Sequence, residues 1–180
     1  EPVYPGETWE YVFPDSQTLE DYGWDAPAVR DAWAFIRDSA NTTGLMVIDR
    51  GRVVFEFGDV EELSYIASVR KSVLAMLYGR WVEDGTIDPG LTLADLGIDD
   101  VGGLLDIEKR ATVGHLITAR SGVYHPASNG GDNLADAPER GSQEPGTYML
   151  YSNWDFNAAG AVFEQLTGIN IYDAVQAQLA

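Results

Sequence analysis

Cysteine is absent from the sequence, and histidine occurs only twice, as His115 and His125. The absence of cysteine excludes disulfide bonds, thiolate-bound zinc and a cysteine nucleophile. Two histidines are too few for a multi-histidine metal site, and Asp132, Asn133 and Asp136 lack the spacing of a calcium-binding loop. We therefore expect no metal ion and no cofactor.

Basic residues are also scarce. The sequence has 11 Lys and Arg residues against 29 Asp and Glu residues, which gives a formal net charge of −18. Lys71 and Lys109 are the only lysines. An acidic surface of this kind repels phosphate backbones, so we expect no nucleic-acid partner. The simplest role of the acidity is solubility, including solubility at high salt.

Long hydrophobic runs are missing as well, because charged residues interrupt every apolar stretch. We therefore expect no membrane span. The chain starts at Glu1 and shows no basic-then-apolar leader, so either a signal peptide has been removed or the chain has been trimmed. We expect an exported protein, periplasmic or extracellular, after signal removal; a cytoplasmic location stays open.

The residues that are present have the composition of a globular domain, with 45% apolar and 22% charged residues over 180 positions. Residues 1–26 are rich in proline and carry aromatic side chains that favour burial, so we expect an ordered N-terminal arm. The main domain is expected at residues 27–180. It opens with a helix for which Asp25 is the N-cap and Pro27 lies in the first turn.

Two β-rich runs at residues 45–57 flank a turn sequence and predict a hairpin, which needs further strands to be stable. The helix predicted at residues 68–84 is apolar nearly all round, which indicates burial on every side. Short helices are expected in the region 91–168, with a loop over 122–147 that is long enough to be functional. Asn153 is the expected N-cap of the last clear helix, and another begins at 171.

Ser68 and Lys71 are the first candidates for chemistry. Three residues along a helix place the two side chains on one face, and Ser68 lies at the positive end of the helix dipole. A serine with a lysine at this spacing can be a nucleophile with a base in reach. The alternative is an N-cap serine followed by a solvated lysine. Burying a lysine ammonium group costs free energy unless the group is paired with an opposite charge or has a catalytic role. This favours the catalytic interpretation.

Tyr151 and Asn153 are the second pair of candidates. In an extended segment they point the same way and offer a phenol and an amide to one cavity. The alternative is a core aromatic followed by a helix cap. Tyr124, Tyr148 and Trp154 flank the same region, where they either line a substrate cleft or pack in the core.

These motifs, in this order, resemble the serine β-lactamase and penicillin-binding-protein superfamily. The similarity is to its class C-like branch, with D-alanyl-D-alanine carboxypeptidases, esterases and amide hydrolases such as 6-aminohexanoate-dimer hydrolase. It covers residues 27–180. The segments that carry it are Ser68-Val69-Arg70-Lys71, the Ser-Gly segment within residues 115–123, Pro145-Gly146-Thr147, and Tyr151-Ser152-Asn153.

The resemblance implies an α+β fold of the β-lactamase/transpeptidase type, with a helical half and an antiparallel sheet. It implies that Ser68 is the acylated nucleophile, that Lys71 takes its proton, and that Tyr151 is the second proton-transfer group. Asn153 would orient Lys71 and bind the substrate, and the Ser68 N–H would be half of an oxyanion hole. The expected activity is hydrolysis of an amide or ester, whether β-lactam, D-amino-acid peptide, small ester or linear amide. The alternative is a penicillin-binding or sensing domain that is acylated without turnover.

The family's third motif, a Lys-Thr-Gly or His-x-Gly strand, has no counterpart in the sequence. The resemblance places that strand, with the other half of the oxyanion hole, after residue 180. We therefore expect a fold that is incomplete at its C-terminus and a segment that is not competent alone. The expected partners are a small-molecule substrate and the remaining C-terminal segment, or a second chain of the same protein.

Overall fold

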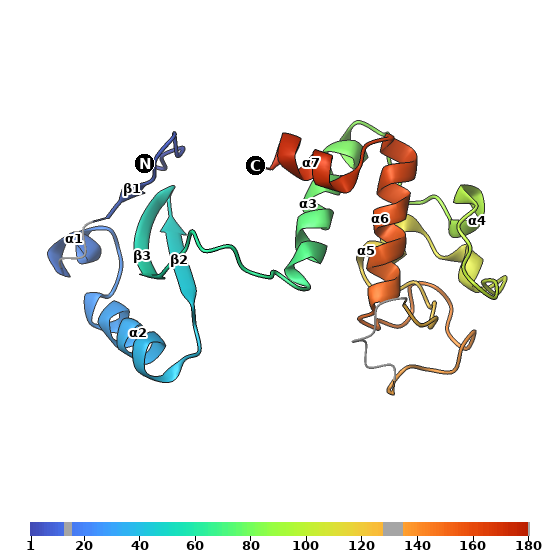
Figure 1. Cartoon of the computed structure of the whole chain (residues 1–180), viewed down its shortest axis with the longest axis horizontal. Coiled ribbons are helices and arrows are strands. Elements are labelled where there is room, and N and C mark those ends of the chain that lie inside the picture. The colour runs from blue at the N-terminus through green and yellow to red at the C-terminus, as the bar shows by residue number, and fades with distance from the viewer. Residues whose placement is uncertain (13–15, 128–134, 180) are drawn as a thin grey trace. The chain divides into compact units, whose positions relative to one another are not determined.

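The computed structural model describes residues 1–12, 16–127 and 135–179. The chain divides into two compact units, Glu1–Tyr65 and Ile66–Ala180 (Figure 1). The residues expected to form an N-terminal arm belong to the first unit together with the hairpin. Among the described residues, no helix combines the length and the apolar character needed to cross a membrane.

The first unit contains a three-stranded sheet in the order β1-β3-β2. Strand β1 (Glu10–Tyr11) pairs in parallel with β3 (Arg52–Gly58), and β2 (Gly44–Asp49) pairs with β3 in antiparallel register. The predicted hairpin is confirmed. Asp49 lies opposite Arg52, and Arg50 and Gly51 between them have φ values of 50° and 77°. Two central residues with positive φ define the tight turn that matches the twist of paired strands.

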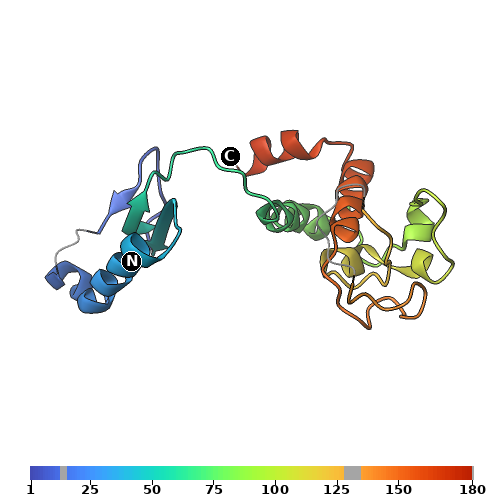
Figure 2. The ribbon, with the colours of Figure 1, turned by 60° about the horizontal axis from the view of Figure 1, so that its bottom comes forward.

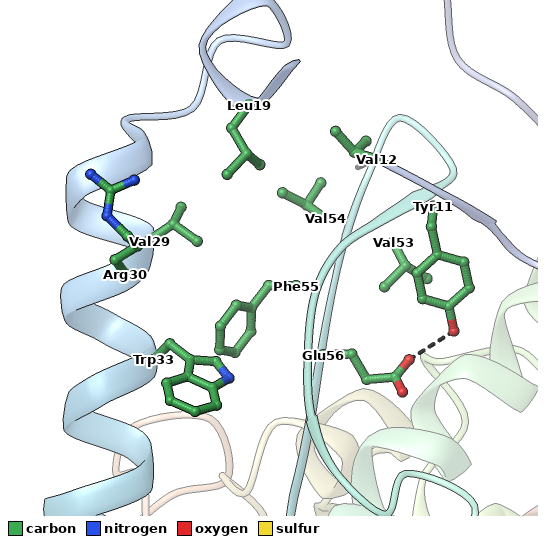
Figure 3. A pocket seen from close by; sticks show the side chains of 10 residues that line it. All are labelled: Tyr11, Val12, Leu19, Val29, Arg30, Trp33, Val53, Val54, Phe55 and Glu56. Carbon is green, nitrogen blue, oxygen red and sulfur yellow. Dashed lines mark hydrogen bonds between the residues drawn. The ribbon is translucent and has the colours of Figure 1, made fainter. Parts of the chain in front are cut away.

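Two helices, α1 (Ser16–Asp21) and α2 (Ala26–Ser39), complete this unit. Asp25 caps α2 as predicted, because its carboxylate accepts a hydrogen bond of 2.9 Å from the Ala28 N–H. Figure 3 shows side chains of α2 facing those of β3 across a cavity of about 300 Å³. Its walls are mostly aliphatic and aromatic, so the small sheet has an apolar face against α2.

The second unit is helical. Its elements are α3 (Val69–Glu83), α4 (Leu93–Leu96), the 3₁₀ helix η1 (Glu108–Arg110), α5 (Val113–Ile117), α6 (Asn153–Thr167) and α7 (Ile171–Gln178). Helix α6 contacts α3, α5 and α7 (Figures 1 and 2). At its centre Phe163 is fully buried, with the Tyr78 ring 5.7 Å away, centroid to centroid. The Tyr78 hydroxyl donates a 2.6 Å hydrogen bond to the Ala159 carbonyl, which joins α3 to α6.

Helix α3 is buried on one side, not on every side as its composition predicted. Lys71, Leu74, Leu77 and Tyr78 are buried, whereas Val69 and Met76 are 60% and 64% exposed. The buried residues recur every three or four positions, so they form one stripe that faces the neighbouring helices. Composition alone did not show this division, because apolar residues occupy both the covered and the uncovered side.

One predicted helix end differs from the structure. Ser152, not Asn153, is the N-cap of α6, since its hydroxyl accepts a 3.3 Å hydrogen bond from the Asp155 N–H. Serine and asparagine are equally good caps, so their preference could not separate two adjacent candidates. Helix α7 begins at Ile171, as predicted, and ends at Gln178.

Candidate active site

Ser68 lies directly before the first turn of α3, on a backbone that is already helical (φ −75°, ψ −7°). Its side chain is exposed and makes no capping hydrogen bond, so the hydroxyl does not satisfy the N–H groups at the start of the helix. Among the described residues, the Ser68 N–H has no acceptor. Both groups are therefore open to a substrate.

The residue before Ser68 has an unusual backbone. Ala67 has a φ of 43°, in the left-handed region that residues other than glycine seldom adopt. Such a conformation costs on the order of 1–3 kcal/mol and persists where the surrounding structure enforces it. Strain of this kind beside an exposed serine is typical of functional sites.

Lys71 is one turn further along α3 and only 5% exposed. Its Nζ lies 4.0 Å from the ring centroid of Tyr151 and 5.1 Å from that of Phe156. Within the part of the chain that the structure describes, Nζ has neither a well-formed hydrogen bond nor a carboxylate partner. Lys71 is therefore not the solvated lysine of the alternative interpretation.

Tyr151 connects Lys71 with Ser68. Its side chain is 49% exposed, and the pKa of its hydroxyl is lowered by interaction with Lys71 and then with Ser68. The Lys71 interaction is the largest effect on this pKa, although Nζ lies over the ring face and makes no well-aligned hydrogen bond. The Arg70 guanidinium adds a smaller effect in the same direction.

Asn153 is the first residue of α6 and is half-buried. Ser152, before it, is buried and extended, with φ −134° and ψ 151°. Residues on either side of an extended residue project to the same side of the backbone, so Tyr151 and Asn153 are expected to share a side.

The three flanking aromatic residues occupy different surroundings. Tyr124 is buried, and its hydroxyl has no hydrogen-bond partner within the described ranges. Burial raises the pKa of Tyr124, with smaller contributions from Tyr148 and Asp155, which places Tyr148 nearby. Tyr148 itself is 40% exposed. Two of the three candidates for a substrate cleft thus lie close to one another.

Trp154 packs in the core instead, where its Nε1–H donates a 2.6 Å hydrogen bond to the Asp100 carboxylate. It lines a cavity of about 420 Å³ that is also bordered by His125. Two residues along a helix differ by about 200°, so Trp154 and Phe156 lie on opposite faces of α6. The structure therefore does not bring Trp154 together with Lys71.

Sequence reasoning missed two features of the site. Phe156 was not among the candidates, and its contact with Lys71 was not foreseen. The Ser121 hydroxyl donates a hydrogen bond of 2.5 Å to the Asp155 carboxylate, and both side chains are buried. The spacing of Asn153 and Phe156 along one helix face was the available signal for the first; nothing local indicated the second.

The described residues contain no group of three or more His, Asp or Glu side chains that could hold a metal ion. Asp132 and Asn133 lie outside the described residues. Thr112 is the N-cap of α5, and the Nδ1 of His115 accepts a 3.2 Å hydrogen bond from the Thr112 N–H. His125 faces the carbonyl oxygens of Val101 and Pro126.

Comparison with known proteins decides the family. The family model described as Beta-lactamase matches residues 25–180. The chain belongs to the beta-lactamase family. This confirms the predicted superfamily and its α+β fold, and places the chain among serine hydrolases in the broad sense.

Among solved structures, the beta-lactamase-family chain is similar to one described as "Crystal structure of SurE with D-Leu", with a TM-score of 0.58 and 24% sequence identity. The similarity covers 85% of this chain and 39% of SurE, and at this identity it supports the fold alone. A search of curated proteins found no match.

Proposed function

We propose that this chain carries the nucleophile and proton-transfer groups of a serine hydrolase that acts on an amide or ester through an acyl-enzyme. The observation that carries the proposal is the burial of Lys71 against Tyr151, one helical turn from an exposed Ser68. Membership of the beta-lactamase family supports it.

In the proposed reaction, the Ser68 Oγ attacks the substrate carbonyl carbon while its proton passes to the Lys71 amine. The Ser68 N–H donates a hydrogen bond to the oxygen that becomes negative, which is typically worth a few kcal/mol in the transition state. The carbon–nitrogen or carbon–oxygen bond then breaks, and the leaving group takes a proton through Tyr151. Water, deprotonated by the same groups, attacks the acyl-enzyme and releases Ser68.

The lowered pKa of Tyr151 supports its place in this relay. General acid–base groups work best when their pKa lies near the working pH, and tyrosine must be lowered to approach it. Asn153, on the same side of the backbone as Tyr151, is the proposed amide for binding the substrate carbonyl or amide group.

The proposed substrates are small molecules with an amide or ester bond: a β-lactam, a D-amino-acid peptide, a small ester or a linear amide. The similar SurE structure was solved with D-Leu, which supports testing D-amino-acid peptides first. The chain spans 39% of SurE's length, so the activity of the whole protein is itself part of the proposal.

The test is covalent labelling of the full gene product with a fluorophosphonate and, separately, with a penicillin. Mass spectrometry is expected to place the adduct on Ser68, and Ser68→Ala should abolish labelling. Ser72→Ala, an exposed serine one turn further along α3, is the matched control and should react normally. An adduct on Ser121 or Ser152 would overturn the assignment. Stable acylation without release of product would favour the penicillin-sensing alternative.

A further inference from the structure

Phe156 occupies a position beside Lys71 that the proposed reaction does not use. Its ring centroid lies 5.1 Å from the Lys71 Nζ, and 6.0 Å from the ring centroid of Tyr151, with the two planes inclined at 50°. The two rings therefore contact the same ammonium group. They come from the segment that ends in Tyr151 and from the second turn of α6.

The surroundings of Lys71 make these ring faces important. An ammonium group that is removed from water needs compensation, usually a carboxylate or several hydrogen bonds. Lys71 has neither among the described residues. The negative faces of aromatic rings attract a cation within about 6 Å, and more strongly when water is excluded.

We propose that Phe156 is a positioning residue that, together with Tyr151, holds the Lys71 side chain beside Ser68 through its ring face. The inference rests on the proposed function, since it concerns the amine that takes the proton from Ser68. It adds to that function a residue that acts on the reaction only through Lys71.

Ring geometry separates this role from simple packing. A leucine at position 156 would still be apolar but has no negative face, whereas tyrosine or tryptophan would keep one. Phe156→Leu should therefore leave the Lys71 side chain less firmly held beside Ser68, whereas Phe156→Tyr and Phe156→Trp should hold it as in the wild type.

The experiment is NMR of the full gene product with ¹³C-labelled lysine, in which the Lys71 Cε–Hε signal is assigned by its loss in Lys71→Arg. In the wild type, the two rings should shift this signal upfield. Phe156→Leu should reduce the upfield shift of this signal, and Phe156→Tyr should restore it. Because the measurement needs no substrate, it stands apart from the labelling of Ser68.

The acylation rate provides a second readout. Phe156→Leu should slow labelling by the fluorophosphonate about tenfold at neutral pH, while Phe156→Tyr preserves the rate. The inference is overturned if Phe156→Leu leaves both the Lys71 signal and the labelling rate unchanged, or if leucine and tyrosine act alike. If Ser68→Ala is still labelled normally, the proposed function fails, whatever the Phe156 variants show.

Discussion

The Ser121 hydroxyl donates a 2.5 Å hydrogen bond to the Asp155 carboxylate, and each side chain is only 2% exposed. This bond ties the chain after α5 to the first turn of α6. The Ser121 oxygen also accepts a 3.0 Å hydrogen bond from the Val123 N–H, so one hydroxyl serves two buried groups. The start of α6, which this hydrogen bond holds in place, follows directly after Tyr151.

Removal of this hydroxyl should destabilise the second unit. Ser121→Ala leaves the Val123 N–H and one Asp155 oxygen without this partner, which typically costs about 1–3 kcal/mol. Ser142→Ala, at an exposed serine, is the matched control and should change the free energy of unfolding by less than about 0.5 kcal/mol. Urea unfolding of both variants measures the difference. Equal midpoints would contradict a structural role for Ser121.

The buried Glu108 provides a second test. Arg140 donates two hydrogen bonds of 2.8 Å to its carboxylate, and the Leu105 N–H donates one of 2.7 Å. Burial alone would raise the pKa of Glu108, but the Arg140 hydrogen bonds and the Leu105 N–H outweigh it and lower the pKa. Arg140→Met should cost about 2 kcal/mol, less than for a fully buried pair because Arg140 is 37% exposed.

The exposed pair Arg110–Glu144 is the control for this variant, since both side chains are about 60% exposed and Arg110→Met should cost at most about 1 kcal/mol. The sign of the pH dependence follows from the lowered pKa of Glu108. The Glu108 carboxylate contributes fully to the free energy of unfolding above its pKa in the unfolded chain, near 4.5. This contribution is lost as the pH falls through the lower pKa of the folded state. The stability difference between wild type and Arg140→Met should therefore shrink below about pH 4.

Tyr151 and Lys71 should each be needed for turnover. Tyr151→Phe and Lys71→Ala are expected to lower kcat by about 10²–10⁴-fold, the range for a general acid or base, while circular dichroism shows an intact fold. Tyr172→Phe, at an exposed phenol on α7, should change kcat by less than tenfold and is the control. Near-normal turnover by Tyr151→Phe would exclude it from the proton relay.

The pKa of Tyr151 gives a direct check of its electrostatic surroundings. Lys71, followed by Ser68, lowers it, so Lys71→Met should raise the pH at which Tyr151 ionises. The change is measured with ¹³Cζ-labelled tyrosine, and Tyr151→Phe identifies the signal. A midpoint that does not rise in Lys71→Met would contradict the interaction.

The turn between β2 and β3 allows a matched pair of glycine substitutions. A Cβ at Gly51 would overlap the Val3 carbonyl oxygen, at a φ of 77°, so Gly51→Ala should destabilise the first unit by more than about 1 kcal/mol. Gly79 lies on the exposed side of α3 with open space around it, and Gly79→Ala should stabilise the second unit by about 0.5–1 kcal/mol. Thermal unfolding of the two variants tests whether the first lowers and the second raises the stability of its unit.

The sequence alone determined the features that depend on neighbouring residues. Asp25 predicted the start of α2, and the turn sequence at Arg50 and Gly51 predicted the hairpin, because caps and turns are set by a few adjacent residues. The ordered spacing of Ser68, Lys71 and Tyr151 likewise indicated the family, since that order is a property of the chain itself.

Only the tertiary structure decided which faces are covered and what surrounds each candidate. It placed Lys71 between the rings of Tyr151 and Phe156, turned Trp154 toward Asp100, and left Met76 exposed. These outcomes depend on contacts between segments far apart in the sequence. Hydrophobic burial is non-directional, so an apolar pattern shows that a side chain can be buried but not which partner it meets.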